Sequence, residues 1–179
     1  KIIKETKKGD AYIINFITRL FIKEGFTVIS QTYYNPELVL KKGTYTKTKP
    51  NYINKKDIKI GKKIINNLKL KGISQGILVA KGNIVISENL KGTDFMLNKA
   101  KKKLKTYISK NKREGILLKF PKPNQDLKTD LPTVGIKTVK KCAILGIRGI
   151  VVKAKHNIFL DRKKSLKIAN KNNMFVSAI

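Results

Sequence analysis

The residue types best suited to chemistry gather in one proline-rich loop, which reads FPKPNQDLKTDLPTVG between positions 120 and 135. The loop carries two carboxylates four residues apart, Asp126 and Asp130, in a chain with only 11 acidic residues against 41 basic ones. Three prolines restrict the backbone around them, so their side chains have less conformational entropy to lose when they hold a ligand. Two carboxylates beside several lysines suit a divalent metal ion and a phosphate. The alternative is an acidic loop that only leads into a helix.

The segment Gly92-Thr93-Asp94 is a second candidate, because an anion can bind to the N–H groups at a helix N-terminus. The alternative is that Thr93 simply caps the helix. His156 is the only histidine and is expected in an exposed turn, which argues against a Ser-His-Asp or Cys-His machinery. Cys142 is the only cysteine, so an internal disulfide is excluded, and its apolar surroundings (CAILGI) favour a buried structural thiol.

Length and composition indicate one globular domain, or one domain with a small appendage. The chain has 179 residues, of which 41% are hydrophobic, and this is enough apolar material for a core. No run of the sequence approaches the roughly 20 apolar residues that a membrane span needs.

The net charge of +30 would suit a basic nucleic-acid-binding module, which is one alternative for the function. Only four of the 41 basic residues are arginines, however, and arginine is the preferred residue for bidentate recognition of bases and phosphates. The lysines are spread along the chain with abundant Ile and Asn, which fits coding bias in an A/T-rich genome. We therefore expect no specific nucleic-acid binding, although the charge favours anionic membranes or substrates.

The order of apolar and polar segments predicts an α/β fold, with a single mixed-sheet domain and flanking helices. Asp10, Thr93 and Asp161 are expected to cap helices, and residues 31–54 to form a long irregular connection. Helices are predicted at residues 11–24, 57–70, 94–111, 136–145 and after 161; strands are predicted at 26–30, 76–87 (a hairpin with its turn at Gly82-Asn83), 115–120, 149–154, 157–160 and 174–179.

Taken together, these segments resemble the LpxI-type UDP-2,3-diacylglucosamine pyrophosphatases of Gram-negative lipid A synthesis. The resemblance rests on SQGILVAKGNIVISENLKGTDFML, on ILLKFPKPNQDLKTDLPTVGIKTV, and on the closing segments AILGIRGIVVKA and IFLDRKKSLKIANKNNMFV. It implies that residues 9–179 are the C-terminal catalytic domain of that family. Residues 1–8 are then the remnant of a linker from an N-terminal domain, in keeping with a first residue that is not methionine.

The resemblance also implies an activity. The family hydrolyses the pyrophosphate of UDP-2,3-diacylglucosamine to UMP and 2,3-diacylglucosamine 1-phosphate (lipid X), with a divalent metal ion of the Mg²⁺ type. Such an enzyme is expected to be cytoplasmic and peripheral at the inner membrane, with a second copy of the chain, in a homodimer, as a further expected partner. A relative that binds the nucleotide-lipid without turning it over is the other alternative for the function.

Carried onto this sequence, the resemblance assigns roles to ten residues. Asp130 is expected to be the catalytic carboxylate, as a metal ligand or as the group that orients the attacking water. The expected metal ligands are Asp130, Asp126, Asp94 and Glu88; the expected substrate-binding residues are Thr93, Lys119, Lys122, Gln125, Lys128 and Thr133.

Overall fold

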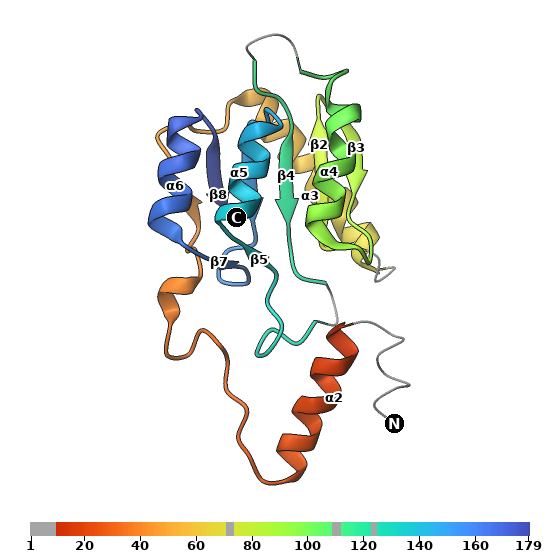
Figure 1. The fold of residues 1–179 in the computed structure, drawn as a ribbon, viewed down its shortest axis with the longest axis vertical. Coiled ribbons are helices and arrows are strands. Elements are labelled where there is room, and N and C mark those ends of the chain that lie inside the picture. The colour runs from red at the N-terminus through yellow and green to blue at the C-terminus, as the bar shows by residue number, and fades with distance from the viewer. Residues whose placement is uncertain (1–9, 71–73, 109–111, 123–124) are drawn as a thin grey trace.

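A six-stranded mixed sheet with helices on both faces organises the computed structural model, which describes residues 10–70, 74–108, 112–122 and 125–179 (Figure 1). The predicted α/β fold with a mixed sheet is therefore confirmed. Along the sheet, the strands follow the order β1 (Gly43–Thr44), β8 (Phe175–Ala178), β6 (Gly149–Val152), β4 (Ile116–Lys119), β2 (Gly76–Ala80) and β3 (Asn83–Ser87).

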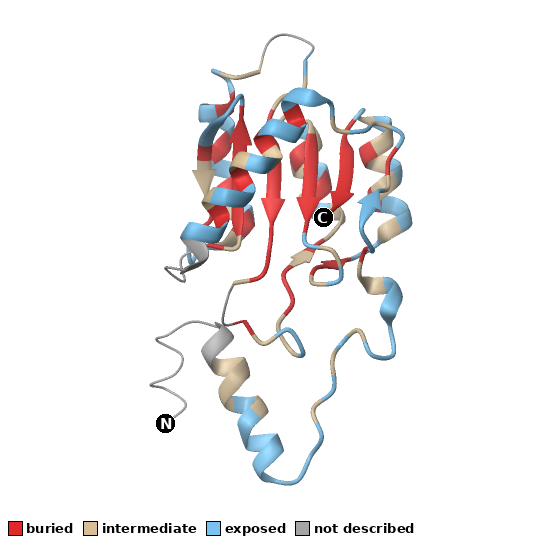
Figure 2. Ribbon diagram, turned by 180° about the vertical axis from the view of Figure 1, so that it is seen from behind, coloured by how far each residue is buried: buried red, intermediate tan, exposed pale blue. Residues whose placement is uncertain are grey.

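The sheet is mixed, with three parallel strands at its centre and antiparallel pairings towards both edges. Strands β4, β6 and β8 are parallel to one another, whereas β2 is antiparallel to both β3 and β4, and β1 is antiparallel to β8. Every residue of β2, β4, β6 and β8 is buried (Figure 2). Strands that are buried on both faces have nearly continuous apolar sequences. These strands can therefore be recognised from the sequence.

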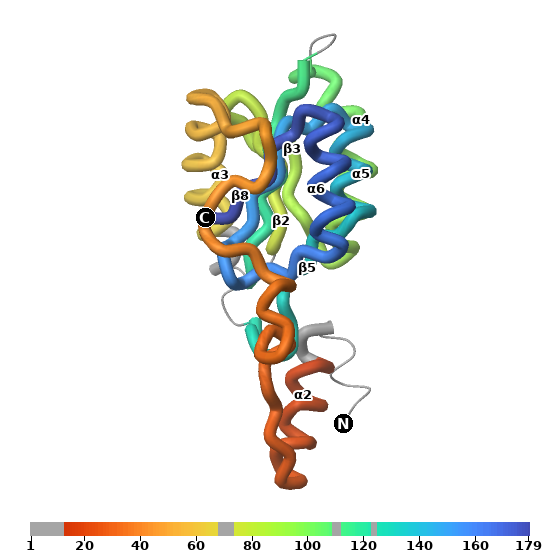
Figure 3. Tube along the Cα trace, turned by 90° about the vertical axis from the view of Figure 1, so that its left-hand side faces the viewer, coloured from red at the N-terminus to blue at the C-terminus, as the bar shows by residue number. Residues whose placement is uncertain are grey.

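Four helices cover the two faces of the sheet (Figure 3). Helix α3 (Tyr52–Leu70) lies on one face, and α4 (Gly92–Leu104), α5 (Ile136–Ile144) and α6 (Arg162–Lys171) lie on the other. The side chains of β4 alternate between the two faces of the sheet and so contribute to both hydrophobic cores. Leu118 belongs to the cluster that contains Ile65 of α3, and Leu117 belongs to the cluster that contains Met96 of α4. None of the helices in the described ranges has the length and apolar content to span a bilayer.

A second, two-stranded sheet fixes the end of the aspartate loop, defined here as residues 125–132. In it, β5 (Thr133–Val134) pairs in parallel with β7 (Ile158–Phe159), and Val39 forms an isolated bridge to Ile158. The loop therefore delivers the chain directly to the start of α5.

Helix α2 (Asp10–Lys23) and the segment after it project away from the sheet on the side of the aspartate loop (Figures 1 and 3). This arm is attached to the loop through Gln31, whose backbone N–H donates to the Lys128 carbonyl (3.1 Å) and whose Nε2 donates to the Thr129 carbonyl (2.8 Å). A short 3-10 helix, η1 (Pro36–Leu38), follows in the long connection.

Several predicted details are wrong. Residues 26–30 form no strand, and Phe26 (62% exposed) lies on the surface, because no neighbouring strand supplies hydrogen bonds. The hairpin turn is Lys81-Gly82, one residue earlier than predicted, because both residues take the positive φ (49° and 80°) that this tight turn requires. Helix α4 starts at Gly92 and ends at Leu104, short of the predicted end at 111. The predicted linker, residues 1–8, lies outside the described residues.

Candidate active site

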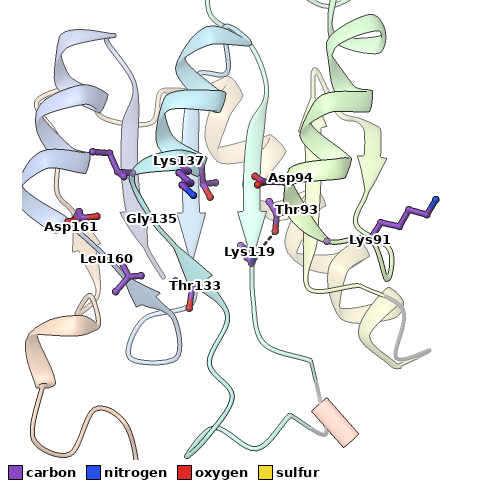
Figure 4. A pocket seen from close by; sticks show the side chains of 12 residues that line it. Lys91, Thr93, Asp94, Lys119, Thr133, Gly135, Lys137, Leu160 and Asp161 are labelled. Carbon is purple, nitrogen blue, oxygen red and sulfur yellow. Dashed lines mark hydrogen bonds between the residues drawn. The ribbon is translucent and has the colours of Figure 1, made fainter. Parts of the chain in front are cut away.

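A cavity of about 520 Å³ opens at the edge of the sheet where β4 ends (Figure 4). The helices α4, α5 and α6 all begin around it. Ligands of open α/β sheets typically bind at this position, outside the carboxyl ends of the parallel strands. The lining residues are Lys91, Gly92, Thr93, Asp94, Lys119, Thr133, Gly135, Ile136, Lys137, Thr138, Leu160 and Asp161.

The three helices that begin at the cavity lack side-chain caps among the described residues. The N-cap positions are Lys91 for α4, Gly135 for α5 and Asp161 for α6, and none of them makes a side-chain capping hydrogen bond. The first N–H groups of a helix have no partner inside the helix. Uncapped helix starts beside one cavity therefore offer N–H donors and positive dipole ends to an anion.

Of the predicted caps, Thr93 is wrong, and Asp161 is right in position but makes no capping hydrogen bond. Thr93 lies inside the first turn of α4, and its hydroxyl donates to Glu88 Oε1 (2.8 Å) instead of accepting from the helix backbone. Asp161 occupies the N-cap position of α6 in the left-handed region (φ 47°), and its exposed side chain lies at the cavity wall. The side chain of Asp10 lies outside the described residues.

Lys119 brings a buried ammonium to the cavity. It is the last residue of β4 and only 8% exposed, and its Nζ donates a hydrogen bond to Thr93 Oγ1 (Figure 4). Glu88 Oε1 lies 3.9 Å from the same Nζ. Burial lowers the pKa of Lys119, and the nearby carboxylates of Glu88 and Asp94 oppose that shift. The Lys119 ammonium is thus placed to bind an anionic ligand at a site that is partly shielded from water.

Asp94 stands at the opening of α4, where its side chain forms an ion pair with Lys141 of α5 (Nζ to Oδ1 3.1 Å). Both side chains are substantially exposed, so water screens the pair. Asp161 supplies the other carboxylate of the cavity wall.

The aspartate loop is held by its own polar side chains. Asp126 accepts from the Lys128 N–H (2.9 Å) and from the Thr129 hydroxyl (2.8 Å), so its carboxylate organises the turn. Gln125, which is buried, accepts from the Lys122 N–H (2.9 Å). Asp130 is half-buried, and its backbone N–H donates to the Asp126 carbonyl (2.8 Å).

Four of the ten predicted site residues line the cavity: Thr93, Asp94, Lys119 and Thr133. Glu88 lies directly behind the wall, in contact with two of them. The others, Lys122, Gln125, Asp126, Lys128 and Asp130, belong to the loop or its approach and are not part of the lining. The expectation that Asp94 and Asp130 take part in one metal site stays a prediction.

Sequence reasoning missed Lys91, Leu160, Asp161 and residues 135–138 of the lining. Asp161 was interpreted as a cap, and residues 135–138 contribute the start of a helix rather than a chemical motif. A glycine directly before α5 is a signal that could have pointed to this helix start, because Gly135 leaves the N-cap position without a side chain.

No three His, Cys, Asp or Glu side chains within the described ranges are close enough together to hold a metal ion. Mg²⁺ commonly keeps several waters and is bound by one or two carboxylates together with substrate phosphates. Asp94 and Asp161 are the two carboxylates of the cavity lining, and either one, together with substrate phosphates, would match that smaller donor set.

Fold and cavity together define an α/β domain with a cavity, lined by three helix starts, at the carboxyl edge of its parallel strands. The family model for the LpxI C-terminal domain matches residues 41–177, and the chain belongs to this family. The UDP-2,3-diacylglucosamine pyrophosphatase LpxI of Caulobacter vibrioides is 29% identical over 179 residues, an alignment that covers 99% of this chain. The chain spans 64% of the length of that relative.

Proposed function

We propose that the protein hydrolyses the pyrophosphate of UDP-2,3-diacylglucosamine to UMP and 2,3-diacylglucosamine 1-phosphate, a step of lipid A synthesis. Membership of the LpxI C-terminal domain family and the activity in the name of the Caulobacter relative support this activity. The observation that carries it is the meeting of three uncapped helix starts with the buried Lys119 at one cavity. A diphosphate is the part of the substrate that such donors recognise.

Each residue of the site has a task in this reaction. The N–H groups at the starts of α4 and α5 bind phosphate oxygens, and the ammonium of Lys119 neutralises part of their charge. Thr93 and Thr133 orient the bound group through their hydroxyls, while Lys122, Gln125 and Lys128 contact the substrate from the aspartate loop and its approach. Asp130 acts as the carboxylate that aligns the attacking water or takes part in metal binding.

The reaction is proposed to depend on a divalent metal ion, with Mg²⁺ as the best fit to the oxygen donors present. Asp94 or Asp161 would hold it together with substrate oxygens, and Asp126 and Asp130 are further candidates. When bound, the ion supplies neutralisation of the charge that develops on the phosphate oxygens.

The lipid part of the substrate suggests where the protein works. We place it at the cytoplasmic face of the inner membrane, as a peripheral protein whose net charge of +30 favours anionic headgroups. A homodimer is the proposed assembly.

A direct assay tests the proposal. The full-length natural protein, purified, is incubated with UDP-2,3-diacylglucosamine with and without Mg²⁺, and UMP and 2,3-diacylglucosamine 1-phosphate are quantified. We expect equal amounts of both products, and only with the metal. Tight binding without products would instead identify a non-catalytic relative. Absence of binding, with salt-resistant binding to DNA or RNA, would support the nucleic-acid alternative.

A further inference from the structure

Glu88 is a buried carboxylate that does not line the cavity yet contacts two residues that do. It follows β3 directly and is 5% exposed. Its Oε1 accepts the Thr93 hydroxyl at 2.8 Å and lies 3.9 Å from Lys119 Nζ. Glu88 therefore stands one layer behind the wall, where it can act on a ligand only through Thr93 and Lys119.

The contacts determine which group donates and which accepts in the two hydrogen bonds of Thr93. A hydroxyl has one proton, and Thr93 gives that proton to Glu88, so a lone pair of Oγ1 is left to accept from the Lys119 ammonium. The ammonium has three N–H donors, of which Thr93 takes one. Lys119 itself lines the cavity, so its remaining donors are available to a ligand there.

The position of the Glu88 carboxylate is set by a glycine. A Cβ built on Gly76 would lie 2.4 Å from Glu88 Oε2, a distance that no real contact allows, and the Glu88 N–H donates to the Gly76 carbonyl (2.8 Å). Oε2 is buried without a hydrogen-bond partner among the described residues. Such an oxygen is costly to bury, and the Lys119 ammonium, 3.9 Å from Oε1, offsets the charge of the carboxylate as a whole.

We propose that Glu88 is a positioning residue, which holds the Thr93 hydroxyl and the Lys119 ammonium in place to bind a phosphate oxygen of the substrate. The inference rests on the proposed function and deepens it. It gives Glu88 a role other than that of a metal ligand. The two roles differ in a measurable way, because a positioning residue affects phosphate binding even when no metal is present.

Binding of inorganic pyrophosphate to the full-length natural protein, measured by calorimetry without divalent metal, tests this role. We expect Glu88→Gln and Thr93→Val each to raise the Kd for pyrophosphate about tenfold, since each disturbs a hydrogen bond that positions a charged group. Thr93→Ser keeps the hydroxyl and should stay within about twofold of the wild type. Lys119→Met should weaken binding at least as much as Glu88→Gln.

A double variant separates action through Lys119 from an independent effect. If Glu88 acts through the ammonium, adding Glu88→Gln to Lys119→Met weakens pyrophosphate binding little further. Fully additive losses would overturn the proposal. Gly76→Ala, which displaces the carboxylate but keeps its charge, should also weaken binding, and Glu37→Gln on the exposed surface serves as the matched control.

Steady-state kinetics with UDP-2,3-diacylglucosamine provide the second readout. We expect Glu88→Gln to raise KM by about tenfold while kcat falls less, because the contact serves binding in the ground state as well as the transition state. Unchanged pyrophosphate affinity with a raised Mg²⁺ requirement would overturn the positioning role, as would a wild-type protein that does not bind pyrophosphate. If the variants behave as expected towards pyrophosphate but the wild type releases no UMP, the proposed function fails and the role of Glu88 stands. Should Glu88→Gln not fold, the comparison of Gly76→Ala with the wild type decides.

Discussion

The ammonium of Lys141 lies 3.1 Å from a carboxylate oxygen of Asp94 and joins α5 to α4 at the rim of the cavity. Asp94 is one of the two carboxylates that line this cavity, so a cation already occupies one of its oxygens. A metal ion that binds to Asp94 must compete with Lys141 or share the carboxylate with it.

Replacing Lys141 with methionine should therefore ease binding of Mg²⁺. Lys141→Met removes the competing cation and leaves the Asp94 carboxylate free. The pair is largely exposed, so the effect should be modest, a fall of about two- to fivefold in the Mg²⁺ concentration that gives half-maximal hydrolysis. The neighbouring Lys140→Met, also on α5 and exposed, is the matched control. An unchanged Mg²⁺ response in Lys141→Met would remove Asp94 from the metal site.

The two aspartates of the loop should respond differently to the same substitution. Asp130→Asn is expected to lower kcat by on the order of a hundredfold or more, because the variant keeps the size of the side chain but loses the charge that serves the transition state. The melting temperature and the affinity for substrate should stay close to those of the wild type. Near-normal turnover in a folded Asp130→Asn protein would exclude Asp130 from the mechanism.

Asp126→Asn is the comparison for that variant. The carboxylate of Asp126 accepts hydrogen bonds at both oxygens, from Lys128 N–H and from the Thr129 hydroxyl, and an amide can accept at only one. We expect this variant to lose about 1 kcal/mol of unfolding free energy, because one hydrogen bond typically contributes that much. We also expect a higher KM, because the loop is less well ordered. The measurement is the unfolding midpoint, which should be lower than in the wild type for Asp126→Asn and unchanged for Asp130→Asn.

The sheet could be predicted from the sequence because its buried strands are short apolar runs rich in β-branched residues. The segment at 26–30 has the same composition but forms no strand: Ile29 is 46% exposed and no other strand pairs with it. Pairing depends on a distant partner, which a local run does not reveal. The register of the hairpin turn similarly depended on two positive φ angles, at Lys81 and Gly82.

The candidate site was only partly predictable for a related reason. Thr93 and Lys119 could be singled out by residue type and by resemblance, but they are 26 positions apart and only the fold joins them. The start of α5 at residues 135–138 offers backbone N–H groups to the cavity, and such groups carry no side-chain signature in the sequence. Asp161 fits the sequence pattern of an ordinary cap, and only the structure shows that it makes no capping hydrogen bond and lines the cavity.

Asp57 illustrates a purely structural carboxylate, and its removal should lower stability without touching the cavity. It is 2% exposed on α3, and its two oxygens accept from the N–H groups of Lys81 (3.1 Å) and Gly82 (2.6 Å) in the hairpin turn. Asp57→Ala should cost about 2–4 kcal/mol of unfolding free energy, because two hydrogen bonds to a charged group are lost. Urea unfolding measures this, with the exposed Asn66→Ala on the same helix as control. A loss below that of the control would show that water replaces the carboxylate at no cost.

Cys142 should make the fold sensitive to alkaline pH. Its side chain is fully buried, and burial raises the pKa of the thiol to about 12. In the unfolded chain the thiol has a pKa of about 8.5, so between about pH 8.5 and 12 the unfolded state releases a proton that the folded state keeps. The stability contributed by the neutral thiol is complete below about pH 8.5 and declines as the pH rises, at a slope that approaches about 1.4 kcal/mol per pH unit.

Urea unfolding of the wild type and of Cys142→Ala at pH 8 and pH 10 isolates this effect. Other groups, the lysines above all, also titrate in this range, but they do so in both proteins and cancel in the comparison. Between the two pH values the wild type should lose about 2 kcal/mol more unfolding free energy than the variant. The variant itself is expected to be less stable at pH 8, because a small cavity replaces the sulfur, so the slopes rather than the levels are compared. Equal slopes in both proteins would mean that the thiol titrates in the folded protein as it does in the unfolded chain.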